Sequence, residues 1–150
     1  SQISDDVEAV WSYDEDGWHV YSPEGPSDLE TIEPGYGYWV KANKETELVV
    51  GGSLLSPAPG VPPSIQLQKG WNLIGKYGLT ENQPAYCALF SLVDTHEGHP
   101  RWSALIKFNS ETDLFEDLNE YSYTNPGEGY WIEMDVSDLY SPATICGMIR

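Results

Sequence analysis

The side chains best suited to chemistry in this sequence form two clusters of metal-ligand type. Residues 94–99 (DTHEGH) hold two histidines and two acids, but Gly98 and Pro100 place them in a loop, without the helical spacing of a zinc protease. Asp14 and Asp16 offer the oxygen ligands that calcium prefers, yet the bidentate glutamate that ends an EF-hand loop is missing. A hairpin turn explains these acids as well. The sequence therefore leaves a weak calcium site as the alternative to a plain turn and predicts no other cofactor.

The sequence contains no pattern that indicates catalysis. We find no glycine-rich phosphate loop, no nucleophile elbow and no basic cluster. Carboxylate pairs carry no information, because with 24 acidic residues some pair satisfies any separation that a glycoside hydrolase needs. We predict that the protein is not an enzyme.

Aromatic side chains are the remaining candidates, because a saccharide ring stacks on a flat aromatic face while nearby carboxylates and amides bind its hydroxyls. Aromatic residues outside the paired framework positions of an internal repeat in the chain are the best candidates for an exposed binding surface. Those predicted to bind a ligand are Tyr21, Tyr36, Trp102, Tyr121 and Tyr123; Tyr77 and Tyr140 belong to the same group. The alternative is that these rings cover apolar neighbours while the tyrosine hydroxyls stay in water.

Charge and composition exclude several classes of partner. The chain has 7 basic and 24 acidic residues, for a net charge of −17, which repels nucleic acid and anionic membrane surfaces. No apolar run approaches the roughly 20 residues of a membrane span, so we expect no direct insertion. With 40% hydrophobic and 13% aromatic residues, disorder is disfavoured. We expect residues 1–150 to form a single compact unit that is monomeric as an isolated fragment.

The internal repeat organises the chain. Residues 34–40 (PGYGYWV) recur as residues 126–132 (PGEGYWI), an offset of 126 − 34 = 92 positions. Two further segments, 9–14 and 48–51, align in the same order with later ones, which makes a chance resemblance improbable. The resulting division of the chain is pseudo-repeat one at 7–55, a proline-rich linker at 56–63 and pseudo-repeat two at 65–148.

Most elements of both copies read as short strands. In each copy a proline and a glycine precede the Gly-Tyr-Trp strand, and Gly35 and Gly127 occupy the third position of a type II turn, which needs a positive φ. Only residues 83–93 read as helical. We therefore predict a mainly β fold, an antiparallel β-sandwich or barrel-like body built from two pseudo-repeats with one short helix.

Aromatic residues present in both copies are predicted to be framework, because both halves need them to pack. Trp39 matches Trp131, and Trp11 and Trp18 match aliphatic residues of the second copy. We predict that these aromatic residues lie in or near the core. The first copy lacks an equivalent of residues 70–75, which leaves a strand edge open. Of three ways to fill it (a shared strand at 65–75, upstream sequence, or a donated strand), we expect the shared strand, with Trp71 and Ile74 between the halves.

Cys87 and Cys146 are predicted to form a disulfide that ties the helix to the last strand. Such a bond would close a loop of 146 − 87 = 59 residues. The alternative is that both are buried thiols that act as small hydrophobic residues.

The order of residues 70–74 (GWNLI), a short helix, a strand of the type at 10–14 (VWSYD) and the PGxGYWV motif resembles a repeat module of large secreted and cell-surface proteins of archaea and bacteria. The second copy departs from this pattern at Leu114, where a tryptophan is expected, and at residues 106–108. The resemblance implies an extracellular or cell-surface location and no catalytic residues. We therefore predict a non-catalytic structural or interaction module, such as one used in adhesion, whose partners are other modules of a surface protein. The alternative is a carbohydrate-binding module that uses exposed aromatics to bind an extracellular glycan.

Overall fold

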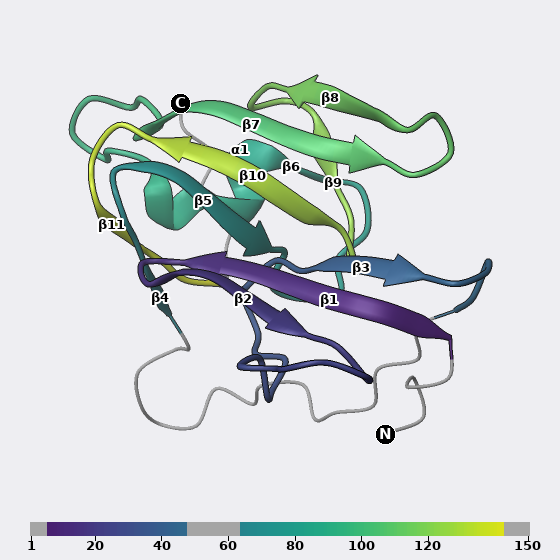
Figure 1. Cartoon of the computed structure of the whole chain (residues 1–150). Helices are drawn as coiled ribbons and strands as arrows, with labels where there is room; N and C mark the ends of the chain where they lie inside the picture. The colour runs from purple at the N-terminus through teal and green to yellow at the C-terminus, as the bar shows by residue number, and fades with distance from the viewer. Residues whose placement is uncertain (1–5, 48–63, 143–150) are drawn as a thin grey trace.

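The computed structural model describes residues 6–47 and 64–142 and is mainly β, as predicted. All strand pairs are antiparallel, and they form a three-stranded sheet, a four-stranded sheet and two short strand pairs. In Figure 1 the three-stranded sheet lies below the four-stranded one. The predicted linker at 56–63, Cys146 and the closing strand of the second copy lie outside the described residues.

Sheet A has the strand order β2-β1-β3 and comes from the first copy. Its strands are β1 (Val7–Asp14), β2 (Gly17–Tyr21) and β3 (Trp39–Ala42). The predicted hairpin at 14–17 is present, with Asp14 opposite Gly17, and Gly17 has φ 108°. The Asp16 amide donates to Asp14 Oδ1 at 2.9 Å. These acids therefore build a turn, which accounts for their spacing.

Sheet B has the strand order β5-β10-β7-β8 and comes from the second copy. Its strands are β5 (Gly70–Gly75), β7 (Trp102–Asn109), β8 (Leu114–Leu118) and β10 (Gly129–Met134). Both predicted turn glycines adopt positive φ, 88° at Gly35 and 81° at Gly127. A non-glycine residue would be strained at either position.

Short elements cover one face of sheet B. They are β4 (Ile65–Leu67) paired with β11 (Asp138–Tyr140), β6 (Gln83–Pro84) paired with β9 (Tyr123–Thr124), helix α1 (Ala85–Ala88) and the 3₁₀ turn η1 (Phe90–Leu92). The prediction of one helix over 83–93 is wrong in its length, because the α-helix covers only Ala85–Ala88 and a separate 3₁₀ turn follows. Helical geometry is interrupted at Leu89, whose φ and ψ are −104° and 22°. Cys87 lies in α1 and is disulfide-bonded.

The main hydrophobic core lies between sheet B and these covering elements. Alternation along β10 sends Tyr130, Ile132 and Met134 into this core, where they are at most 3% exposed. Ile74 from β5 and Tyr140 from β11 complete the centre of the cluster. Every member of this cluster comes from residues 65–140, so in the described chain the largest core belongs to the second copy.

Strand β5 pairs on both of its edges. One edge pairs with β10 over its whole length, and the other meets residues 35–37 through a bridge between Tyr36 and Ile74. The Gly37 amide donates to the Leu73 carbonyl at 3.2 Å, and the Gly75 amide donates to the Gly35 carbonyl at 2.9 Å. The expected sharing of this strand is therefore present at Ile74.

Sheets A and B contact each other through aromatic rings. Trp39 lies 5.0 Å from Phe108 and 5.8 Å from Phe115 between ring centroids, and Trp131 lies 5.7 Å from Tyr13. Trp39 of the first copy therefore contacts two aromatic rings of the second copy. These rings are not fully buried, however, because neighbouring residues of a strand face opposite sides and Tyr130, rather than Trp131, points into the main core.

Candidate functional site

Rings from both sheets line an open groove, here called the aromatic groove. Sheet A contributes Tyr13 and Trp18, and sheet B contributes Trp71, Ile106, Phe115 and Trp131, around a volume of about 470 Å³. A second hollow of about 460 Å³ continues along sheet A and is lined by Trp11, Trp18 and Trp39. Trp18 lines both and connects them.

The register of the strands explains why the rings gather on one face. Tyr13 lies opposite Trp18, and Trp11 lies opposite both Val20 and Trp39. Directly opposed residues of antiparallel strands share a face. The same rule gathers Trp71, Trp131, Ile106, Phe108 and Phe115 on one face of sheet B through their register.

The aromatic groove is unusually exposed for so many large rings. Trp18 is 56% exposed, Phe115 59% and Trp71 42%. The prediction that Trp18 lies in or near the core is therefore wrong. Trp71, expected as framework between the halves, lies at the surface where the halves meet. No carboxylate belongs to the described lining. Contiguous exposed apolar surface of this kind marks binding sites in soluble proteins.

The opposite face of sheet A carries a third hollow, here called the acidic pocket. Its volume is about 300 Å³. The lining residues are Ser12, Asp14, His19, Asp28, Leu29, Glu30, Thr31, Glu33, Tyr36 and Tyr38. Strands β1 and β2 supply the floor, and the segment 28–38, which returns to the sheet as β3, supplies the walls.

His19 anchors that segment to the sheet. Its Nε2 lies 3.0 Å from Asp14 Oδ1 and its Nδ1 lies 3.2 Å from Asp28 Oδ2. Asp28 Oδ1 also accepts a hydrogen bond from the Val20 amide at 2.7 Å. The hydrogen bond to Asp14, followed by attraction to the carboxylates, raises the pKa of His19. The hydrogen bond from the Val20 amide leads the causes that lower the pKa of Asp28.

The predicted ligand-binding residues do not form one surface. Tyr121 and Tyr123 are 70% and 61% exposed and lie close together in the sequence before and within β9. Tyr36 lines the acidic pocket, together with the predicted calcium ligand Asp14, whereas Tyr21 ends β2. Trp102 is only 7% exposed, so its prediction as an exposed binding residue is wrong.

Trp102 is buried because β7 begins on the core side of sheet B. It belongs to the main cluster, and its indole Nε1 is a buried donor without a hydrogen-bond partner among the described residues. No local pattern signals this burial, since a tryptophan at the first position of a strand can face either side.

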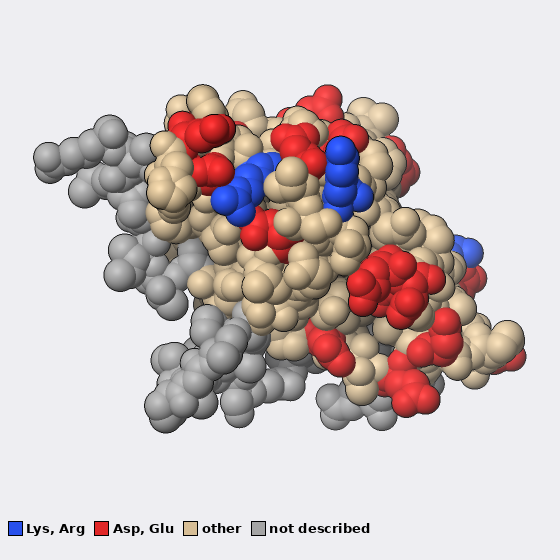
Figure 2. Space-filling view, turned by 90° about the vertical axis from the view of Figure 1, so that its left-hand side faces the viewer, with Lys and Arg blue, Asp and Glu red and all other residues tan. Residues whose placement is uncertain are grey.

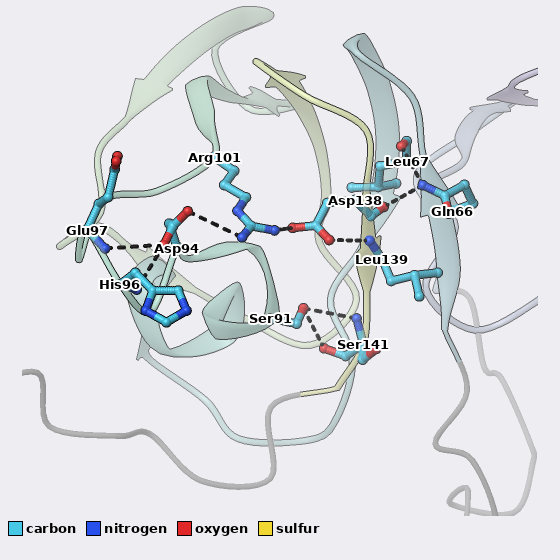
Figure 3. A network of polar contacts seen from close by, with 10 residues as sticks. All are labelled: Gln66, Leu67, Ser91, Asp94, His96, Glu97, Arg101, Asp138, Leu139 and Ser141. Atoms are coloured by element: carbon cyan, nitrogen blue, oxygen red, sulfur yellow. Dashed lines mark hydrogen bonds and ion pairs between the residues drawn. The ribbon is translucent and has the colours of Figure 1, made fainter.

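The histidine-rich loop is held by local hydrogen bonds. Asp94 Oδ1 accepts the amides of His96 and Glu97 at 2.8 and 3.2 Å, and these bonds lead the causes that lower the pKa of Asp94. Figure 3 shows Arg101 between Asp94 and Asp138, at 3.3 and 2.8 Å. Asp94 and Arg101 therefore have structural partners that fix this loop.

In the described ranges, neither the acidic cluster at Asp14 and Asp16 nor the histidine-containing loop at residues 94–99 forms a group of metal ligands. Within residues 6–47 and 64–142, no three His, Cys, Asp or Glu side chains converge to hold an ion. Figure 2 shows several separate patches of acidic side chains on one face, with basic side chains at only a few points. The described part of the chain also has no helix long and apolar enough to cross a membrane.

Sequence reasoning misses the aromatic groove because it assigns matched aromatics to a core. The alternation of Trp11 and Tyr13 along β1 and the hairpin that places Trp18 opposite Tyr13 are visible in the sequence. Which face of the strand is covered is not visible there, because burial depends on segments that are distant in the sequence. Comparison of the chain with protein-family models, curated proteins and solved structures finds no significant match.

Proposed function

We propose that the chain is a non-catalytic structural and interaction module of an extracellular or cell-surface protein, and that the aromatic groove is its docking surface. One observation carries the proposal: Trp18, Trp71 and Phe115 line a common hollow of about 470 Å³ while each remains at least 42% exposed. Burying such rings against a partner is favourable in proportion to the apolar area removed from water.

The strand order supports a body built from two pseudo-repeats. Sheet A runs β2-β1-β3, and the equivalent strands of sheet B run β8-β7-β10, followed by β5. In both sheets, the first strand of a hairpin pairs on its other edge with the Gly-Tyr-Trp strand. We propose that the two sheets form an open sandwich, joined by the aromatic contacts and by the shared strand β5.

The chemistry of the groove favours a protein partner over a glycan. Sugars need carboxylates, amides or hydroxyls beside the stacking ring. The described side chains that line the groove offer only the Tyr13 hydroxyl and the indole nitrogens. Glu133 lies opposite Trp71, and Asp117 lies opposite Ile106, so both share this face of sheet B. With a net charge of −17, the proposed occupant is a segment of a neighbouring module with apolar side chains and basic flanks.

Selection from a random-peptide display library tests this proposal. The wild-type chain is expected to enrich peptides with aromatic or aliphatic anchors next to Lys or Arg. Trp18→Ala should weaken binding of the enriched peptides by roughly tenfold or more, as buried anchor residues do. Leu139→Ala is the matched control, because Leu139 is 50% exposed but lies on β11, away from the groove.

A glycan array distinguishes the alternative. Binding of a defined glycan that Trp18→Ala abolishes, together with no enrichment of peptides, would replace the proposal with a carbohydrate-binding function. Enriched peptides that bind Trp18→Ala as tightly as the wild type would show that the groove is not the docking surface. Circular dichroism of each variant establishes that the fold is retained.

A further inference from the structure

The acidic pocket lies on the face of sheet A that turns away from the aromatic groove. Ser12 and His19 are directly opposed on β1 and β2, and they alternate with Trp11, Tyr13 and Trp18, which face the groove. The pocket is therefore a separate site, and binding of a ligand there does not depend on the proposed docking function.

The pocket carries a strong excess of negative charge. Asp14, Asp28, Glu30 and Glu33 line it, and no Lys or Arg belongs to its described lining. In that described lining, His19 is the one side chain that can carry a positive charge to offset the acids, and it already contacts Asp14 and Asp28. The carboxylates of Glu30 and Glu33 have no hydrogen bond or ion pair within the described ranges.

The two tyrosine rings on the wall lie in this negative field. Burial is the largest cause that raises the pKa of Tyr36 and of Tyr38, and the nearby charges of Glu33 and Asp14 raise both pKa values further. An aromatic face next to carboxylates attracts a cation through the ring quadrupole as well as through charge.

Ser12 provides an observation that is independent of the charges. The residue is only 5% exposed and lines the floor of the pocket. In the part of the chain that the structure describes, its hydroxyl takes part in no hydrogen bond. In the described ranges the Trp102 indole nitrogen is the only fully buried side-chain polar atom without a partner, so the Ser12 hydroxyl oxygen is open to the pocket, where it can accept a hydrogen bond. A ligand with an N–H donor would supply that hydrogen bond.

The dimensions favour an organic cation over a metal ion. The described side chains form no group of three metal ligands, and the 300 Å³ volume is that of a small ligand site. We propose that the acidic pocket binds an alkylammonium or alkylguanidinium group, with its N–H donors on Ser12, Glu30 and Glu33 and its alkyl chain along Tyr36 and Tyr38. Such a group occurs in free amines and in the Lys or Arg side chains of a partner protein.

Titration followed by amide NMR tests the proposal with defined probes. Butylammonium and butylguanidinium are expected to give saturable shifts at Ser12, His19 and Glu33, whereas neutral butanol is not. Glu33→Gln and Ser12→Ala should each weaken binding by roughly fivefold, the first by losing a partly exposed charged contact and the second by losing one hydrogen bond to the cation. Glu111→Gln makes the same change in net charge at an exposed site outside the pocket lining and should leave the affinity unchanged.

His19 gives a readout that a purely structural role would not change. It faces Asp14 from β1 and the acids Asp28, Glu30 and Glu33 from the returning segment. A bound cation opposes a second positive charge beside it, so saturation with the probe should lower the pKa of His19. Trp18→Ala, in the aromatic groove, should leave these shifts unchanged.

Capped tripeptides with a central Lys, Arg or Gln distinguish the two sources of the cation. Binding of the Lys or Arg peptide at least tenfold tighter than the butyl cations supports a partner side chain, and equal affinity supports a free amine; both agree with the proposal. Shifts that do not saturate, or a loss with Glu111→Gln equal to that with Glu33→Gln, would overturn it, because either result indicates general charge attraction.

Discussion

Replacement of Gly37 by alanine should loosen the junction between the two halves of the molecule. A Cβ at Gly37 would lie 2.7 Å from the Ile74 carbonyl oxygen and 2.7 Å from Leu73 Cγ. Backbone carbonyl oxygens cannot rotate away, so residues 35–37 must move from β5. The equivalent glycine of the second copy, Gly129, is the matched control, because a Cβ there meets nothing closer than 3.8 Å.

The magnitude follows from the contacts that would be lost. Overpacking at a well-packed position is destabilising by about 1–3 kcal/mol. Displacing Gly37 would also remove the bond from the Gly37 amide to the Leu73 carbonyl, worth about 1 kcal/mol. We therefore expect Gly37→Ala to lower the free energy of unfolding by about 2–4 kcal/mol. Gly129→Ala should lie within about 0.5 kcal/mol of the wild type.

Urea denaturation followed by far-ultraviolet circular dichroism measures both variants under the same oxidising conditions. For a chain of this length the expected loss corresponds to a fall in Tm of roughly 5–15 °C. Equal unfolding free energies for Gly37→Ala and Gly129→Ala, within about 0.5 kcal/mol, would refute the close approach of β5 to residues 35–37. A large loss of unfolding free energy in both variants would show that Gly129 has no more room for a Cβ than Gly37, contrary to the structure.

Three further predictions concern charge and covalent links. Because the pKa of His19 is raised in the fold, its contribution to stability is complete below about pH 6.5 and is lost as pH rises through the folded pKa; in thermal scans His19→Gln should flatten this dependence. At a net charge of −17, the Tm should rise with NaCl, since salt screens self-repulsion; a flat response would show local compensation. Reduction should lower the Tm of the wild type but not of Cys87→Ala, because Cys87 is disulfide-bonded.

Local backbone features were predictable because a few residues determine them. Gly35 and Gly127 follow prolines in turns that require positive φ, and both adopt it. The 14–17 turn joins β1 and β2 as its Asp and Gly residues predict. The mainly antiparallel β content also follows from alternating, β-branched and aromatic segments. These features depend on neighbours in the chain, so the sequence alone contains the needed information.

Burial was less predictable because it depends on contacts between distant segments. Trp102 and Trp18 are both strand tryptophans, yet one is 7% and the other 56% exposed. Trp102 is covered because β4, α1 and β11 pack on its side of sheet B. Trp18 lies on β2 of sheet A and faces the open groove instead. The helix also ends earlier than its apolar spacing predicts, since Leu89 turns out of helical geometry and η1 comes next.

The open groove follows from the unequal completeness of the two halves. Sheet B has four strands and a covered inner face, whereas sheet A has three strands and rests on sheet B chiefly through rings. Trp131 contacts both Tyr13 and Trp18, with ring centroids 5.7 and 5.8 Å apart, so its loss would affect the junction of the halves and the groove together. Trp18 is 56% exposed, so its replacement should affect folding less than replacement of Trp131. Stability and docking are therefore separable at Trp18 but coupled at Trp131, because the rings that join the sheets also form the exposed surface.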